Sequence, residues 1–232
     1  MLKYSTGAID YHNREAKTFK EKYQDKQSFK KRLLTWEHLI RGANSKFDRA
    51  MDIGCGPGWM TKILCDVSNS VVAIDGAARM LEQSRATVGD AADQVEFIEA
   101  AIVPSLFDRW PSKSFDLIIS SSVLEYVENA ELILKKSFEV LSPSGTLIFS
   151  LPNASSWFRM IETNLFRWLG KPIYRGLLVN VWNDKDTVKM LERIGFKVDT
   201  VLWQGYVPYF SEIFFWLPKR FRKPMMIIVA KK

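Results

Sequence analysis

The stretch MDIGCGPGWMT, residues 51–61, places three glycines, a proline and an acid directly after an apolar start. Residues 49–54 (RAMDIG) are typical of a short buried strand, and residues 58–67 (GWMTKILCDV) have the apolar spacing of a helix. A glycine loop between a strand and the following helix lies at the carboxyl edge of a parallel sheet, where open α/β folds bind their ligands. We therefore expect this loop to hold a ligand.

The alternation of strand and helix continues along the chain. The region up to about Gly42 is polar and favours helices. Later strands are predicted at 70–75, 95–100, 115–123 and 146–152, and helices at 77–86 and 129–141, the second of which ends at the SPSG turn of residues 142–145. Strands separated by helices form right-handed βαβ units, which build a parallel sheet covered on both faces. The sequence therefore predicts an α/β, doubly wound fold.

The spacing of the glycines narrows the choice of ligand. Asp52, Gly54, Gly56 and Gly58 occupy every second position, which differs from the G-x-G-x-x-G of nicotinamide-dependent dehydrogenases, and no G-K-[ST] follows for a phosphate loop. Gly54 and Gly56 let a ligand approach the main chain, and Gly58 allows close packing of the helix. The charge of Asp52 would repel a phosphate, so the loop suits a ligand that carries an ammonium group.

A second acid adds to this interpretation. Asp75 ends the second strand, 23 residues after Asp52, where an acid in this architecture accepts hydrogen bonds from the two hydroxyls of a ribose. A ribose joined to a cationic amino-acid tail, without phosphate, describes S-adenosylmethionine.

Four segments, in this order and spacing, carry a family resemblance: DIGCGPGWMT, VVAID, FDLIISSSVLEYV and LSPSGTLIFSLPN. Together they resemble the class I S-adenosylmethionine-dependent methyltransferases, and most of all the quinone-biosynthesis and natural-product O-methyltransferase group. The resemblance covers residues 47–152 well and 184–232 loosely. It implies a mostly parallel, seven-stranded, Rossmann-like sheet with helices on both faces and an antiparallel last strand. Residues 196–205 and 225–232 fit strands six and seven of this sheet, and residues 184–195 fit the helix before them.

The resemblance also implies which residues bind the cofactor, S-adenosylmethionine, and its product S-adenosylhomocysteine. The glycine loop would hold the methionine part, Asp75 the ribose, and the segment after the third strand the adenine. That segment has Ala101 and Ile102 where relatives usually carry an acid, so backbone groups would bind the adenine there and the affinity could be weaker. The implied cofactor-binding residues are Asp52, Gly54, Cys55, Gly56, Gly58, Asp75, Gly76, Met80, Ala101, Ile102, Ser120 and Ser121.

No catalytic base is identified from the sequence. Many O-methylating relatives read Leu-Glu-His-Val after strand four, and this chain reads LEYV, with Tyr126 in place of the histidine. Tyrosine, with an ordinary pKa near 10, is a poor base but can position a substrate or pack over the cofactor. His12 is a candidate if an N-terminal helix covers the site, as in the family; otherwise it is an ordinary surface histidine.

We expect one methyltransferase domain over residues 1–232, divided into an N-terminal helical cap, a cofactor-binding half, a helical lid insertion, and a C-terminal helix with the last two strands. Their ranges are 1–45, 46–152, 153–183 and 184–232. Five apolar residues of the insertion recur at helical spacing and are candidates for a lid over the acceptor: Trp157, Phe158, Ile161, Leu165 and Trp168. The alternative is a helix that buries this face against the domain.

The acceptor is predicted from the insertions. Residues 153–183 and the aromatic, basic stretch 207–224 suit a hydrophobic small-molecule or lipid-like acceptor, methylated on oxygen or less readily on nitrogen, with peripheral membrane contact. Nucleic acid is disfavoured because the basic residues form no continuous stripe. An RNA methyltransferase and a non-catalytic S-adenosylmethionine-binding module remain alternatives. The oligomeric state is not predicted.

Composition sets the remaining limits. The net charge of +7 does not by itself select a partner. Cys55 and Cys65 have no metal-ligand or disulfide spacing, so we expect reduced thiols and no metal site. The polar start lacks a secretory signal and no long apolar run follows, so we expect a cytoplasmic protein.

Overall fold

The chain folds around one seven-stranded sheet in the part that the computed structural model describes, namely residues 3–44, 46–169, 173–207 and 209–232, with side chains outside the description at 3–6, 20, 165–169 and 173. The strand order is β3-β2-β1-β4-β5-β7-β6. The strands are β1 (Phe47–Ile53), β2 (Ser68–Asp75), β3 (Val95–Glu99), β4 (Phe115–Ser121), β5 (Leu141–Pro152), β6 (Lys197–Gln204) and β7 (Met225–Lys231).

The first five strands are parallel, and β7 is inserted antiparallel between β5 and β6. The predicted fold class, a mostly parallel seven-stranded sheet with an antiparallel last strand, is confirmed. Because β1 and β4 are neighbours in the centre of the sheet, the loops that follow them meet at its carboxyl edge.

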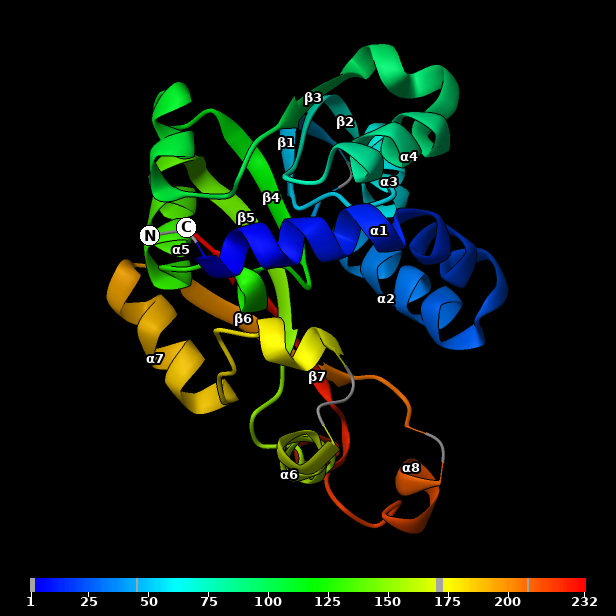
Figure 1. The fold of residues 1–232 in the computed structure, drawn as a ribbon. Helices are drawn as coiled ribbons and strands as arrows, with labels where there is room; N and C mark the ends of the chain where they lie inside the picture. The colour runs from blue at the N-terminus through cyan, green and yellow to red at the C-terminus, as the bar shows by residue number, and fades with distance from the viewer. Residues whose placement is uncertain (1–2, 45, 170–172, 208) are drawn as a thin grey trace.

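Helices cover both faces of the sheet (Figure 1). The α-helices are α1 (Lys3–Asp25), α2 (Gln27–Ala43), α3 (Trp59–Val67), α4 (Ala78–Val88), α5 (Ala130–Val140), α6 (Trp157–Leu169), α7 (Asp184–Ile194), α8 (Phe210–Ile213) and α9 (Lys219–Arg222). The short 3-10 turns are η1 (Gly89–Gln94), η2 (Pro104–Arg109), η3 (Leu124–Tyr126) and η4 (Ile173–Leu177).

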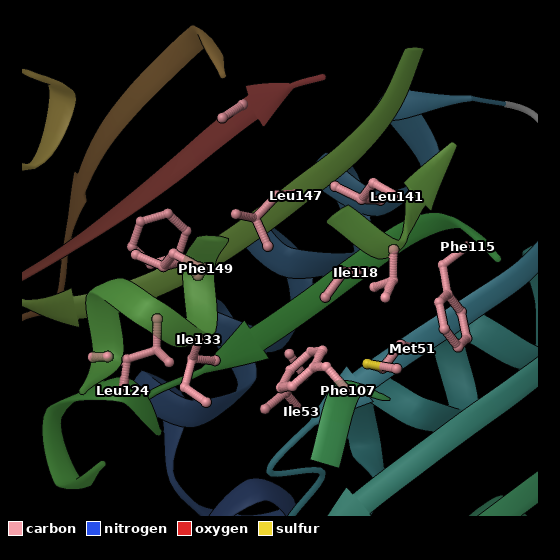
Figure 2. Packing of buried hydrophobic residues seen from close by; sticks show 14 of the residues in the cluster. Met51, Ile53, Phe107, Phe115, Ile118, Leu124, Ile133, Leu141, Leu147 and Phe149 are labelled. Atoms are coloured by element: carbon pink, nitrogen blue, oxygen red, sulfur yellow. The ribbon is translucent and has the colours of Figure 1, made fainter. Parts of the chain in front are cut away.

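Each strand contributes side chains to two cores, because successive residues point to opposite faces. In β1, Met51 and Ile53 belong to the core under η2, α5 and α7, whereas Ala50 belongs to the core under α2, α3 and α4. Figure 2 shows the first core, with Ile53 beside Phe107 of η2. Burial on both faces explains why the central strands read as continuous apolar runs.

The N-terminal region forms two helices with different positions. In α2, Trp36 and Ile40 are fully buried in the second core, so this helix belongs to the layer on that face. In contrast, α1 lies across the carboxyl edge of the sheet, where it contacts α4, η3 and η4 (Figure 1). A Cβ on Gly76, at the end of β2, would lie 2.8 Å from the Ile9 side chain, so α1 packs tightly at this edge.

One predicted boundary was wrong. The SPSG residues do not separate helix from strand, because α5 ends at Val140 and β5 begins at Leu141. Ser144 has a positive φ of 67°, and the pairing of β4 with β5 shifts register between Phe115 and Leu117. The turn residues therefore form an irregularity inside the strand, because the pairing with β4 passes from Leu141 to Thr146 and leaves residues 142–145 out.

Candidate active site

A cavity of about 190 Å³ lies at the carboxyl ends of β1, β2 and β4, and residues of α1 and α2 also line it. It is the place where the topology brings the glycine loop, the end of β2 and the segment after β4 together. Of the predicted cofactor-binding residues, ten line it: Asp52, Gly54, Cys55, Gly56, Asp75, Gly76, Met80, Ala101, Ile102 and Ser121.

Hydrogen bonds to β2 shape the glycine loop. The amides of Gly54 and Cys55 donate to the Ile74 carbonyl, with N···O distances of 2.7 and 2.9 Å. Gly54 has a φ of +70°, and a Cβ there would lie 2.2 Å from Cγ2 of Val123. Gly56 has a φ of +53°, but a Cβ there would meet nothing within 4 Å. Gly54 is therefore required for packing, whereas Gly56 borders the open cavity.

Asp75 joins the loop to the start of α4. Its Oδ2 accepts a hydrogen bond from the Gly56 amide over 2.9 Å, and its Oδ1 accepts one from the Ala77 amide over 2.8 Å. Burial raises the pKa of this carboxyl above its ordinary value, while these backbone donors act in the opposite direction. Each carboxylate oxygen has a second lone pair, so Asp75 can also accept hydrogen bonds from a ligand.

Asp52 presents a buried oxygen without a partner. The Thr61 hydroxyl donates to Asp52 Oδ2 over 2.7 Å, but Oδ1 has no hydrogen-bond partner. Burial raises the pKa of Asp52 to about 7. Since an unpaired buried oxygen is costly, a cationic donor in the cavity would stabilise the ionised carboxylate.

Two predicted residues lie outside the cavity lining. A Cβ on Gly58 would lie 2.7 Å from the Ser84 backbone, which places this glycine in the contact between α3 and α4, as the packing argument predicted. The Ser120 hydroxyl is buried without a partner, and Ser122 lines the cavity together with Ser121. Ser120 lies inside β4 and is buried, whereas Ser122 follows the end of this strand.

Arg32, on α2, belongs to the site but was not among the residues predicted from the sequence. Its Nη2 donates to the hydroxyls of Ser121 and Ser122 over 2.5 and 2.8 Å, and its Nε is buried without a partner. The guanidinium thus forms part of the cavity wall. No local signal distinguishes Arg32 from the neighbouring Lys30 and Lys31, because its role depends on the packing of α2 against the end of β4.

Aromatic side chains from the N-terminal helices form another part of the wall. The cavity is lined there by Phe19 and Tyr23 of α1 and Phe29 of α2, together with Trp59 at the start of α3. The Tyr23 ring contacts Phe29 and Trp59, with centroid distances of 4.9 and 6.2 Å. The helical spacing of aromatic residues before Gly42 was the sequence pattern from which this apolar wall could have been predicted.

His12 and Tyr126, the weak catalytic candidates, both line the cavity, with their ring centroids 5.3 Å apart. Burial lowers the pKa of His12 to about 4, so its imidazole is neutral and weakly basic at pH 7. Burial and the charge of Glu125 raise the pKa of Tyr126 far above its ordinary value. The phenol therefore keeps its proton.

Glu125 is a buried carboxyl beside the cavity that the sequence analysis did not single out. Its Oε2 has no hydrogen-bond partner, and its backbone carbonyl accepts from the amides of Val179 and Asn180. Burial raises the pKa of this carboxyl to about 7, although Arg32, Arg159 and Ser122 act in the opposite direction.

Of the candidate lid residues, the three whose side chains are described do not line this cavity. Trp157, Phe158 and Ile161 lie on α6, where Trp157 is 42% and Ile161 is 53% exposed. The rings of Trp157 and Phe158 contact Phe214 and Phe210 of the second insertion. The side chains of Leu165 and Trp168 lie outside the described residues.

The two cysteines are buried free thiols. Burial raises the pKa of Cys55 well above its ordinary value and that of Cys65 to about 11, so both stay protonated at neutral pH. Among residues 3–44, 46–169, 173–207 and 209–232, no cluster of three or more His, Cys, Asp or Glu side chains could hold a metal ion. Within the same ranges no helix is both long and apolar enough to cross a membrane.

The central part of the chain is similar to known methyltransferases. Residues 51–149 match the model of the methyltransferase domain. The chain is 25% identical over 168 residues to the mitochondrial ubiquinone biosynthesis O-methyltransferase of Rattus norvegicus. This alignment covers 69% of this chain and 48% of that protein. It is 33% identical over 108 residues to the malonyl-[acyl-carrier protein] O-methyltransferase of Erwinia billingiae, covering 47% of this chain and 40% of that protein.

A solved structure supports the fold. The N-methyltransferase NodS from Bradyrhizobium japonicum, determined in complex with S-adenosyl-L-homocysteine, superposes with a TM-score of 0.63 at 15% identity, covering 91% of this chain and 90% of that one. The chain spans less than half the length of the two curated relatives above. The predicted resemblance to class I methyltransferases is confirmed by the matched domain and the shared fold.

Proposed function

We propose that this chain, whose residues 51–149 match the model of the methyltransferase domain, transfers the methyl group of S-adenosylmethionine to an oxygen of a hydrophobic small molecule. The presence of opposite charges in one cavity wall carries the proposal. Asp52 offers a buried oxygen without a partner, and Arg32 offers a buried Nε–H without a partner. An amino-acid tail with an ammonium and a carboxylate complements both groups.

The rest of the cofactor is assigned along the same wall. Gly54 and Gly56 let the methionine part approach the main chain, and the free lone pairs of Asp75 accept the ribose hydroxyls. The adenine is assigned to the apolar wall at Met80, Ala101 and Ile102. Seven of the twelve predicted cofactor-binding residues have a role in this placement, and ten line the cavity.

The acceptor is assigned to the aromatic wall from α1, α2 and the start of α3. Phe19, Tyr23 and Phe29 favour a hydrophobic acceptor. S-adenosylmethionine supplies a methyl group already activated by its sulfonium, so alignment of the acceptor oxygen contributes much of the rate. His12 is a weak base at pH 7 and Tyr126 keeps its proton, so these two residues position the acceptor rather than deprotonate it. An acceptor oxygen that is ionised at neutral pH, such as a carboxylate or an acidic phenol, requires no base.

Binding of S-adenosylhomocysteine, measured by calorimetry, tests the site. We expect one site, and Asp75→Ala should weaken it by about 1.5 to 3 kcal/mol, the range for hydrogen bonds that involve a charged group. Glu99→Gln is the matched control, because this acid ends the neighbouring strand β3 but does not line the cavity. Equal affinity in the Asp75→Ala protein would remove Asp75 from the site.

Transfer of a radiolabelled methyl group tests the activity. The chain, incubated with labelled S-adenosylmethionine and cell extract, should label the organic-soluble pool more than the sugar or RNA pools. Label in RNA would favour the alternative of an RNA methyltransferase. Binding of S-adenosylhomocysteine without label in any pool would favour a non-catalytic module.

A further inference from the structure

Over residues 157–164, where its side chains are described, helix α6 exposes apolar residues and buries charged ones. Its charged residues Arg159 and Glu162 are buried and paired, with 2.6 Å between Nη1 and Oε2, and Arg159 Nε donates to the Pro224 carbonyl over 3.0 Å. Its apolar residues Met160 and Ile161 are 58% and 53% exposed. An amphipathic helix normally buries its apolar side, so this orientation leaves an apolar surface available to a partner.

The segment between β6 and β7 enlarges this surface. Of the twelve large hydrophobic residues exposed in the described part of the chain, eight lie within 157–161 and 206–216. We call these eight residues the aromatic face: Trp157, Met160, Ile161, Tyr206, Tyr209, Ile213, Phe215 and Trp216. Scattered single apolar residues are normal on a protein surface, but concentration in two short segments marks an interaction site.

Ring contacts join the two segments into one surface. Trp157 of α6 lies 6.1 Å from Phe214, measured between ring centroids, and Phe214 lies 6.4 Å from Trp216. Phe158 contacts Phe210, which in turn contacts Phe214 at 4.6 Å. Figure 1 shows α6 and α8 together at the end of the molecule away from α3 and α4.

Positive charge adjoins the aromatic face. Residues 219–223 contain four basic side chains, of which Arg220 is paired with Asp184 at 2.6 Å. Arg222 Nη1 donates to the Phe215 carbonyl over 2.6 Å and so connects the basic segment to the face. Lys219 and Lys223 form no salt bridge with any described residue. Burial lowers the pKa of Lys223, and the nearby positive charges of Arg222, Lys219 and Lys31 lower it further.

We propose that the aromatic face binds an anionic membrane surface, with its tryptophan and tyrosine rings at the level of the headgroups and with Lys219 and Lys223 against the lipid phosphates. Aromatic side chains beside lysine and arginine are the composition of segments that lie in a membrane interface. Unpaired cations favour an anionic surface over a neutral one. Glu212, the one acid among residues 206–223, accepts a hydrogen bond from Tyr206, so little negative charge opposes binding.

Co-sedimentation of the full chain with vesicles tests this proposal. Vesicles of phosphatidylcholine alone are compared with vesicles that contain phosphatidylglycerol, at low and at physiological salt. Phe215→Ala/Trp216→Ala removes two exposed rings, and Lys219→Glu/Lys223→Glu reverses two charges. The matched controls are Leu132→Ala and Lys135→Glu on α5, at the opposite side of the sheet from α2, with Leu132 42% exposed. Thermal melting of every variant verifies folding.

We expect binding to the anionic vesicles that weakens with salt, about 10-fold or greater weakening in each double variant, and no change in the controls. Absence of binding to anionic vesicles would overturn the proposal, as would equal binding by the Phe215→Ala/Trp216→Ala protein. Self-association that this variant abolishes, without vesicle binding, would assign the face to a second copy of the chain and overturn the proposal. Vesicle binding needs no methyl transfer, so its failure is distinct from failure of the proposed function.

Discussion

Arg32 donates a hydrogen bond to the Ser122 hydroxyl over 2.8 Å, although 90 residues separate them in the sequence. This bond connects α2 to the segment after β4 and places a guanidinium in the cavity wall. Trp36 and Ile40, which are fully buried, hold α2 on the sheet independently of this bond. Replacement of Arg32 is therefore expected to change the cavity more than the stability of the fold.

Arg32→Ala should weaken the binding of S-adenosylhomocysteine about 10-fold or more, because a hydrogen bond to a charged group contributes about 1.5 to 3 kcal/mol. Arg41→Ala is the control, since this arginine lies on the same helix but forms exposed ion pairs with Glu37 and Asp66. Calorimetry at fixed salt measures both. Equal losses in the two variants would show a general effect of charge and contradict a specific contact.

The glycines of the loop should separate packing from binding. Gly54→Ala should lower the melting temperature strongly, because its Cβ would overlap Val123 in a positive-φ backbone. Gly56→Val should fold but bind S-adenosylhomocysteine poorly, because its side chain would enter the cavity and strain the loop. Gly42→Ala, in α2 with nothing within 4 Å of its Cβ, should stabilise the chain by up to about 1 kcal/mol. Unchanged binding in a folded Gly56→Val protein would mean that the ligand lies elsewhere.

Glu125 should make stability depend on pH. Its pKa rises from 4.5 to about 7 on folding, so the folded chain binds more protons than the unfolded chain between these values, and stability falls as the pH rises through this window. Between pH 6 and 8 the loss from this group is about 1 kcal/mol, or roughly 2 to 4 °C in melting temperature. Burial acts on Asp52 in the same direction, so Glu125→Gln should reduce the pH dependence without abolishing it.

Melting curves of the ligand-free chain at pH 6, 7 and 8 measure this effect. Glu131→Gln, on the exposed start of α5, should leave the pH dependence as it is. A Glu125→Gln protein with the full pH dependence would assign that dependence to other groups.

The buried pair Arg159–Glu162 should decide the orientation of α6. Arg159→Ala leaves Glu162 with the Tyr174 hydroxyl at 2.6 Å and with Arg175 at 3.7 Å, and should cost about 3 kcal/mol in the free energy of unfolding. Arg159→Met/Glu162→Leu removes both charges and should cost less. Arg193→Ala breaks an exposed pair with Glu131 and should cost under about 1 kcal/mol in urea denaturation. If the Arg159→Ala protein is as stable as the Arg193→Ala control, the buried pair is not needed to orient the helix.

Short-range patterns determined the architecture. The predicted strands at 70–75 and 95–100 are β2 (Ser68–Asp75) and β3 (Val95–Glu99), because apolar runs bounded by turn residues are local signals. The positions of Gly54 and Asp75 in the cavity followed for the same reason. Gly54 directly follows β1 and Asp75 is the last residue of β2, and parallel strands end at one edge.

The tertiary structure alone decided which distant side chains share the site. The contact of Arg32 with Ser122, and the choice of Ser122 over Ser120, depend on how α2 packs against β4 and on where the chain leaves the sheet. The sequence also showed that α6 has an apolar side, but not that this side would face outward. The burial of the Arg159–Glu162 pair beside Pro224 decides that orientation, and such a pairing depends on the rotation of a helix about its axis, which no local pattern of residues specifies.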